Sequence, residues 1–371
     1  MKSLSLAFAL TSFLRGGVEK NIETMMANLQ RKGHSAELIS GSHVNWMEGF
    51  PQVRIRSSSL PVLGTILTAA SFSAALKKRN YDIVNANCYV SAAGAISARK
   101  KTSAPVVRHS PGPEPSHINA VESGLKYRLI KKTYTGSDAI VSPSEWSRQY
   151  IKRVFGRDST VISPSVDVKT FSPENDGSVI RKRLGIGKHD RVVLYVGHML
   201  ERKGVDDLLA ASARVIKKIP DAKFILAGNG CYKAGIERRK EFLRSRGIAG
   251  SVFFTGNVPG GDLPLYYASC DVFCLPSWEE GFGIVFIEAM ASGKPIVSTR
   301  VSAIPSVVEE GKIGMLVPPR NPEELSSALC EMLGNHSLMK EMGRTARKTA
   351  EKKYSWESQT KALLGLYSSL L

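Results

Sequence analysis

Two stretches of the chain share one pattern, and this repetition constrains the fold more than any other feature. Each contains an apolar run, a glycine-bearing loop, an amphipathic segment and a second apolar run. The first is LSLAFALTSF, the loop at Gly16-Gly17, residues 19–31 and AELIS; the second is RVVLYVG, the loop at Lys203-Gly204, VDDLLAASARVIKKI and AKFILAG. This order is typical of the strand–helix–strand unit of a parallel sheet. The sequence therefore predicts two Rossmann-like, doubly wound α/β domains.

The domain boundaries follow from the remaining apolar runs. YDIVNAN, APVVRHS, DAIVSPS and TVISPS predict strands in the first half, and SVFFTGN, DVFCLPS, KPIVSTR and GMLVPP predict strands in the second. A length of 371 residues suits two domains. We expect an N-terminal domain over residues 1–170, a linker over 171–188 where SPENDG interrupts the pattern, and a C-terminal domain over 189–350. Residues 351–371 predict a helix that packs back toward the N-terminal domain.

The cysteines and the N-terminus bear on the compartment. Five cysteines fit neither a zinc-site spacing nor a disulfide framework, which indicates a reducing, cytoplasmic environment. The run LSLAFALTSFL after Lys2 resembles a signal peptide, but it is short, lacks a small-x-small cleavage site and leads into the glycine loop. No stretch qualifies as a membrane span. The best candidate, residues 60–76, contains Pro61 and Gly64 and predicts a packed helix.

The net charge of +18 is unevenly distributed. Residues 1–170 hold 23 Lys and Arg against 11 Asp and Glu, while the rest of the chain holds 28 against 22. Such a basic half attracts anionic lipid headgroups, nucleic acid or phosphorylated substrates. No aromatic–basic motif supports nucleic acid, so we expect no such partner. The segment GLKYRLIKKTY predicts either a helix on an anionic membrane surface or a solvated helix with one buried stripe.

The stretch PSWEEGFGIVFIEAMASGKPIVS carries most of the chemistry. A helix is expected from about Ile284, and Glu288 is the one charged residue in its apolar sequence. A buried carboxylate needs hydrogen-bond donors, which a ribose diol or a neighbouring backbone amide supplies. The turn Gly281-Phe282-Gly283 either exposes backbone N–H groups that bind a diphosphate or merely reverses the chain.

This stretch resembles the Glu-x7-Glu motif of retaining GT-B glycosyltransferases, in particular glycosyltransferase family 4, with Glu280 and Glu288 as its carboxylates. FLRGGVEKNIETMMANLQRKGHSAELIS, LYVGHMLERKGVDDLLAA and EEGKIGMLVPPRNPEELSSAL resemble further segments of that family, in the expected order. The resemblance implies the GT-B architecture, in which two Rossmann-like domains face a central cleft. It also implies retaining transfer of a hexose-type sugar from a nucleotide-sugar donor to a lipid-linked or polysaccharide acceptor.

The resemblance assigns roles to individual positions. His109 would face the reacting sugar, Glu280 would bind donor-sugar hydroxyls and Lys203 would neutralise the leaving diphosphate, which makes these the expected catalytic residues. The expected donor-binding residues are Gly16, Gly17, His198, Arg202, Gly281, Phe282, Gly283, Ile284 and Glu288, the last at the ribose. From the residues alone, a surface lysine, a core histidine and a plain glycine turn explain the same positions.

The chain departs from the family pattern in its donor half. Gly197-His198 stands where the family shows Gly-Arg, and Arg202 is available to compensate. The segment 302–306, Ser-Ala-Ile-Pro-Ser, stands where the family shows Gly-Gly-x-Pro-Glu. Two alternatives therefore stay open: a nucleotide-sugar epimerase of the same fold, or a non-catalytic protein docked on anionic membranes.

The sequence predicts neither a metal nor a cofactor. It contains no Asp-x-Asp, and its His and Cys residues show no ligand spacing. We therefore expect metal-independent chemistry by a cytoplasmic protein, either free or attached to the cytoplasmic face of a membrane.

Overall fold

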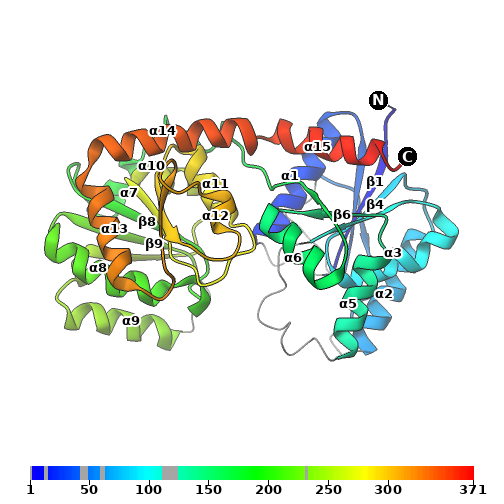
Figure 1. Cartoon of the computed structure of the whole chain (residues 1–371), viewed down its shortest axis with the longest axis horizontal. Helices are drawn as coiled ribbons and strands as arrows, with labels where there is room; N and C mark the ends of the chain where they lie inside the picture. Colours follow the sequence, from blue (N-terminus) through cyan, green and yellow to red (C-terminus); the bar gives the residue numbers. More distant parts are fainter. Residues whose placement is uncertain (1, 12–15, 42–48, 59–62, 111–123, 230–232) are drawn as a thin grey trace. The chain divides into compact units, whose positions relative to one another are not determined.

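The computed structural model describes residues 2–11, 16–41, 49–58, 63–110, 124–229 and 233–371. The chain forms two compact units, here called the first unit (Met1–Ser165 with Trp356–Leu371) and the second unit (Val166–Ser355). Each unit is built around one sheet in which every described strand pairing is parallel (Figure 1). The predicted doubly wound α/β fold is confirmed.

The sheet of the first unit has the strand order β3-β2-β1-β4-β5-β6-β7. Because the order reverses at β1, helices cover both faces of the sheet. The strands are β1 (Ser5–Leu10), β2 (Ser35–Ser40), β3 (Gln52–Arg54), β4 (Ile83–Ala86), β5 (Val106–His109), β6 (Ala139–Ser142) and β7 (Thr160–Val161). The helices are α1 (Gly17–Arg31), α2 (Leu63–Leu76), α3 (Tyr89–Thr102), α5 (Leu125–Gly136), α6 (Glu145–Phe155) and α15 (Trp356–Ser368).

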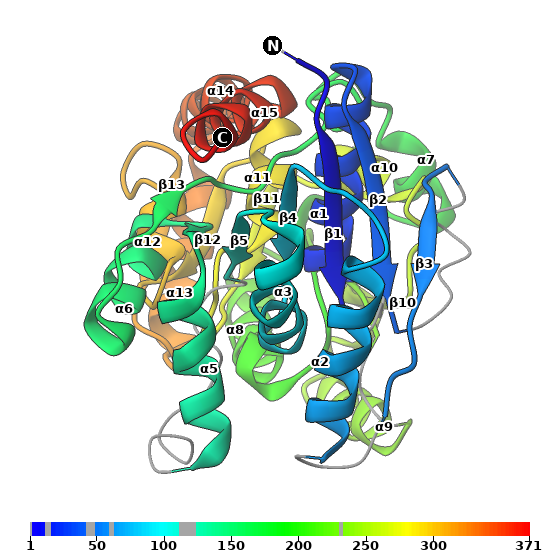
Figure 2. The same ribbon diagram turned by 90° about the vertical axis from the view of Figure 1, so that its right-hand side faces the viewer.

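Strand β1 shows how the sequence divides between the two faces. Leu6 and Phe8 join the buried cluster that includes residues of α1 and α15, whereas Ala7 and Ala9 join the cluster that includes residues of α2 and α3. Successive side chains of a strand point to opposite faces, so the alternation of large and small apolar residues sets the space beneath each helix layer. Figure 2 shows α2, α3 and α5 side by side over one face of this sheet.

The sheet of the second unit has the order β10-β9-β8-β11-β12-β13. Its strands are β8 (Arg191–Val196), β9 (Ala222–Ala227), β10 (Val252–Gly256), β11 (Val272–Leu275), β12 (Ile296–Thr299) and β13 (Gly314–Val317). Its helices are α7 (Ser178–Arg183), η2 (Glu201–Lys203), α8 (Val205–Lys218), α9 (Lys233–Ser245), η3 (Ala249–Ser251), α10 (Leu263–Ser269), α11 (Ile284–Ala291), α12 (Ile304–Val307), α13 (Pro322–Gly334) and α14 (His336–Lys353). One large apolar core fills the space between sheet and helices.

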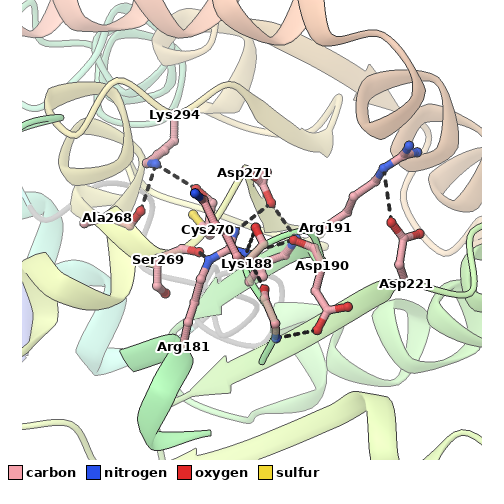
Figure 3. Close-up of polar contacts among 12 residues, drawn as sticks. Arg181, Lys188, Asp190, Arg191, Asp221, Ala268, Ser269, Cys270, Asp271 and Lys294 are labelled. Atoms are coloured by element: carbon pink, nitrogen blue, oxygen red, sulfur yellow. Dashed lines mark hydrogen bonds and ion pairs between the residues drawn. The ribbon is translucent and has the colours of Figure 1, made fainter. Parts of the chain in front are cut away.

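The segment predicted as a linker, residues 171–188, lies inside the second unit. Phe171 is buried in the core of that unit. From α7, the Nε of Arg181 donates to the Ser269 carbonyl at 2.8 Å and its Nη2 donates to the Asp271 carboxylate at 3.0 Å (Figure 3). The polar run that interrupts the apolar pattern is therefore a turn within a unit and not the boundary between two.

The terminal helix differs from its expected range. Helix α14 continues to Lys353 in the second unit, and the helix that belongs to the first unit is α15. There α15 packs against α1: the Nε2 of Gln359 donates to Asn21 Oδ1 at 2.9 Å, and the Arg31 guanidinium lies 4.8 Å from the centre of the Trp356 ring. The first unit is thus completed by the last residues of the chain.

Candidate active site

Lys203 and Glu280 meet at the carboxyl edge of the second sheet. Lys203 ends the short helix η2 after β8, and Gly204 follows with a φ of 65°. A Cβ at Gly204 would lie 1.9 Å from the Pro276 carbonyl oxygen, so only glycine allows the two loops to touch there. This close approach lets the Lys203 ammonium form an ion pair with the Glu280 carboxylate.

The Lys203–Glu280 pair is largely shielded from water. The side chains of Lys203 and Glu280 are 12% and 11% exposed. A shielded ion pair loses little strength to screening, and removing either partner leaves an uncompensated charge. The resemblance gave these residues separate roles, and their direct pairing, which joins positions 77 residues apart, was not predicted.

The glycine turn that follows Glu280 fixes the start of α11. Gly283 has a φ of 81°, a conformation that L side chains rarely adopt, and a Cβ there would lie 2.5 Å from the Phe286 ring. The Phe282 side chain is buried and packs edge-on against Tyr354, with ring centres 5.8 Å apart, and Ile284 packs against the core. The Phe282 side chain is thus taken up by packing, whereas Ile284 is only half-buried.

Glu288 is buried on α11 and accepts a hydrogen bond from the Tyr267 hydroxyl at 2.9 Å. Burial and the nearby Glu288 carboxylate raise the pKa of Tyr267 well above its usual range, so the hydroxyl stays a donor. Sequence reasoning offered a ribose or a backbone amide as the donor and missed this tyrosine. No spacing signal marks Tyr267, because α10 and α11 meet only in the folded unit.

His198 lies on the loop between β8 and η2, Arg202 lies in η2 itself, and both are exposed. The backbone of this loop is nevertheless held in place. The Tyr195 hydroxyl donates to the His198 carbonyl at 2.8 Å, and the Arg202 carbonyl accepts from the Trp278 N–H at 2.8 Å. Both side chains are therefore accessible on an anchored loop at the same edge as the Lys203–Glu280 pair.

The departure at residues 302–306 has a structural consequence. Ser302 has a φ of 47°, a conformation for which the family's glycine is better suited. The next residue, Ala303, donates its N–H to the Glu280 carbonyl at 3.3 Å. The substituted segment therefore still supports the loop that carries Glu280.

In the first unit, Gly16 and Gly17 lie at the start of α1. The Gly16 N–H donates to the Glu19 carboxylate at 3.2 Å, and burial raises the pKa of Glu19. A carboxylate from the chain itself therefore occupies an N–H that the resemblance assigns to the diphosphate. Residues 12–15, which precede the glycines, lie outside the described residues.

His109 is the last residue of β5 and is buried in the first unit. Its Nε2 lies 2.9 Å from the Asn85 Oδ1. Burial, and next the neighbouring Arg108 charge, lower the pKa of His109 from 6.5 to about 3, so the imidazole is neutral near pH 7. The alternative of a core histidine with a polar partner describes this environment, and the role facing a sugar stays a prediction.

Among the residues that the structure describes, no three His, Cys, Asp or Glu side chains form a group that could hold a metal ion. The expectation of metal-independent chemistry stays a prediction. Within the same described part, no helix is both long and apolar enough to cross a membrane.

Two family models match successive parts of the chain. The model described as Glycosyltransferase Family 4 matches residues 15–170, and the model described as Glycosyl transferases group 1 matches residues 177–349. These ranges follow the two units of the structure and contain every predicted site residue. The chain therefore belongs to the group 1 glycosyltransferases of the GT-B fold, and within them it is similar to glycosyltransferase family 4.

Curated relatives are similar over part of their length. A D-inositol 3-phosphate glycosyltransferase of Corynebacterium kroppenstedtii is 32% identical over 66% of this chain and 53% of that protein. A GDP-mannose-dependent alpha-(1-6)-phosphatidylinositol monomannoside mannosyltransferase of Mycolicibacterium smegmatis is 28% identical over 64% of each. The chain thus spans about half the length of the first of these curated relatives.

Solved structures agree in fold over the whole chain. Anabaena Alr3699/HepE, in a complex with UDP and glucose, superposes with a TM-score of 0.84, 21% identity and coverage of 99% of this chain and 100% of that one. WaaG, a glycosyltransferase involved in lipopolysaccharide biosynthesis, gives a TM-score of 0.77 at 18% identity, over 96% of this chain and 98% of that one. At these identities the likeness shows the fold alone.

Proposed function

We propose that the protein is a retaining, metal-independent glycosyltransferase that moves a hexose-type sugar from a nucleotide-sugar donor to a lipid-linked or polysaccharide acceptor. The observation that carries the proposal is the shielded Lys203–Glu280 pair at the carboxyl edge of the second sheet. Parallel α/β sheets bind their ligands at this edge. The names of the curated relatives support both a nucleotide-sugar donor and an inositol-type or lipid acceptor.

The residues at this edge match the charges that develop in such a transfer. The bond between the sugar C1 and the diphosphate breaks, the acceptor oxygen bonds to C1 on the same face, and the acceptor proton leaves on the diphosphate. Lys203 compensates the negative charge that grows on the diphosphate, and Glu280 accepts hydrogen bonds from the sugar hydroxyls. Fixed charges aimed at a leaving group are usually the largest catalytic contribution. On donor binding, Lys203 exchanges part of its contact with Glu280 for the diphosphate.

The surface of the first unit supports attachment to an anionic membrane. On α5, Ile130 and Tyr134 are buried, which is the single buried stripe of a surface helix. The exposed cations of this helix are Lys126, Arg128, Lys131 and Lys132. Exposed cations on a surface helix meet the phosphates of anionic headgroups.

Helix α2 adds an exposed apolar surface to the same unit. Residues 63–76, the described part of the segment predicted as a packed helix, pack on α3 with one face only. Leu63, Ile66 and Leu67, in the first turns, are 56%, 55% and 49% exposed. Helices α2 and α5 flank α3 (Figure 2). Exposed apolar residues and exposed cations on one unit fit a lipid headgroup region, in which apolar side chains enter the acyl boundary.

Release of nucleoside diphosphate from a panel of nucleotide sugars tests the activity. The assay contains EDTA and a membrane-lipid extract, and it compares the wild type with Glu280→Gln and with the matched control Glu279→Gln. We expect acceptor-dependent release from one donor, lost in Glu280→Gln and kept in the control, with the donor's anomeric configuration retained in the product. Sugar conversion without an acceptor would instead identify an epimerase, and donor binding without release would identify a non-catalytic protein.

A further inference from the structure

Three buried side chains of the first unit, those of Tyr367, Asn85 and His109, are linked by hydrogen bonds. The Tyr367 hydroxyl of α15 donates to the Asn85 Oδ1 of β4 at 2.7 Å. The same oxygen lies 2.9 Å from the His109 Nε2 on the neighbouring strand β5. Tyr367 and Asn85 are completely buried, and His109 is nearly so. All three belong to the first unit, although Tyr367 and Asn85 are 282 positions apart in sequence.

The chemistry of the carboxamide fixes the state of the imidazole. A carboxamide oxygen only accepts hydrogen bonds, so the Nε2 of His109 must carry the proton. The Nδ1 is then unprotonated and presents a lone pair. Among the described residues, the structure gives this nitrogen no hydrogen-bond partner. Asn85 is oriented in turn, because its Nδ2 donates to the Ala7 carbonyl at 3.4 Å and its Oδ1 receives the tyrosine.

We propose that Asn85 and Tyr367 are positioning residues that hold His109 in its Nε2–H tautomer and present its Nδ1 as a hydrogen-bond acceptor to a substrate hydroxyl. This inference rests on the proposed function for its catalytic meaning, and on the geometry alone for the tautomer. In this proposal α15 does more than pack against the first unit, because its Tyr367 hydroxyl also orients the Asn85 carboxamide.

The burial of these groups argues for a directed arrangement. A polar group buried without a partner costs free energy, whereas apolar residues would fill the same space at no such cost. Around the three side chains the structure uses apolar residues, including Leu363 on α15 and Val107 on β5. Because the Asn85 Oδ1 only accepts hydrogen bonds, Tyr367 and His109 must both donate to it, and this fixes which nitrogen of His109 carries the proton.

The first experiment measures the tautomer and does not depend on any transferase activity. Proteins labelled with ¹⁵N and ¹³C in histidine are compared at pH 7 by NMR, and the His109 ring signals are assigned as those lost in His109→Gln. We expect ring shifts of the Nε2–H tautomer in the wild type and a mixture of tautomers in Asn85→Leu. An Nδ1–H tautomer or a protonated ring in the wild type would overturn the proposal.

The second experiment separates positioning from folding. Tyr367→Phe removes one buried hydroxyl, and Tyr81→Phe, at which a buried hydroxyl donates to Glu37 in the same unit, is its matched control. We expect kcat to fall about 3- to 10-fold in Tyr367→Phe with the donor KM unchanged, the equivalent of one lost hydrogen bond. Tyr81→Phe should lower thermal stability without a change in kcat.

The outcomes distinguish this inference from the proposed function. If the wild type transfers sugar and Tyr367→Phe keeps the wild-type kcat, the positioning role is wrong and the proposed function stands. If the wild type transfers nothing, the proposed function fails, and the NMR comparison still decides whether Asn85 and Tyr367 set the tautomer of His109.

Discussion

The two units place their predicted site residues at the same edge of similar sheets but hold them by different means. In the second unit, glycines let loops touch: a Cβ at Gly204 would lie 1.9 Å from Pro276 O, and a Cβ at Gly228 would lie 1.9 Å from Gly197 O. The result is an ion pair, Lys203–Glu280. In the first unit, side chains from separate elements hold a neutral histidine through hydrogen bonds.

This difference explains why the sequence marks the candidate residues of the second unit more clearly than the contacts around His109. Backbone contacts between neighbouring loops require glycines, which stand out in a sequence. A side-chain network among Asn85, His109 and Tyr367 uses residues that have no mutual spacing. The charged site should therefore respond to loss of charge or of glycine, and the neutral one to loss of a hydroxyl or to acid.

The largest effect is expected at the charged site. Lys203→Ala should lower kcat by about 10²- to 10³-fold, because it removes the cation that we propose meets the leaving diphosphate. Nucleoside diphosphate release under saturating donor measures this change. Lys217→Ala, on the exposed side of α8, is the control and should behave as wild type. Equal rates for Lys203→Ala and wild type would remove the charged site from the mechanism.

The glycine contacts should matter nearly as much for stability. Gly204→Ala should cost about 3 kcal/mol in the free energy of unfolding of the second unit, because it combines a φ of 65° with a clash against Pro276. Gly247→Ala is the matched control: its φ is 68°, yet a Cβ there would meet no atom within 4 Å. It should cost about 1 kcal/mol, from backbone strain alone. Urea unfolding measures both, and equal losses would show that the loop contact adds nothing.

Membrane attachment should depend on the exposed apolar residues of α2 and not on exposed apolar residues elsewhere in the two units. The double variant Ile66→Ser/Leu67→Ser should bind vesicles of anionic and neutral phospholipid about 10- to 30-fold more weakly, since each exposed side chain contributes about 1 kcal/mol on insertion. Cosedimentation at low salt measures the binding. Val161→Ser/Val179→Ser, which also replaces exposed apolar residues, should bind like wild type. Unchanged binding by the α2 variant would leave only the cations of α5 to attach the protein, and binding by neither protein would rule out attachment.

Acid should destabilise the first unit through His109. Its pKa is about 3 when folded and 6.5 ordinarily, so the unfolded chain takes up the proton first. The stabilising contribution is complete above pH 6.5 and is lost as the pH falls toward 3, by at most about 1.4 kcal/mol per pH unit. Between pH 6.5 and 5.5, wild type should lose about 1 kcal/mol more than His109→Asn in urea unfolding. Equal losses of unfolding free energy in wild type and His109→Asn would contradict a buried, neutral His109.

The fold and part of the site could be predicted because their signals are local. Gly281, Gly283 and Glu288 lie on one strand–turn–helix segment, and the pattern of that segment is complete within it. The position of α2 was only half predicted. Its uncharged sequence indicated a packed helix, and one face of the helix does pack on α3. The composition does not show that the opposite face, with Ile66 and Leu67, is exposed.

The sequence by itself determined the two α/β units, the strand–glycine–helix order in each and the family, because apolar periodicity and glycine positions act over a few residues. Only the tertiary structure decided that Lys203 pairs with Glu280, that Tyr267 donates to Glu288 and that α15 completes the first unit beside Asn85. The physical reason is that hydrogen bonds and ion pairs depend on positions in space to within tenths of an ångström. Tyr367 and Asn85, which are 282 residues apart in sequence, reach such positions only in the folded first unit.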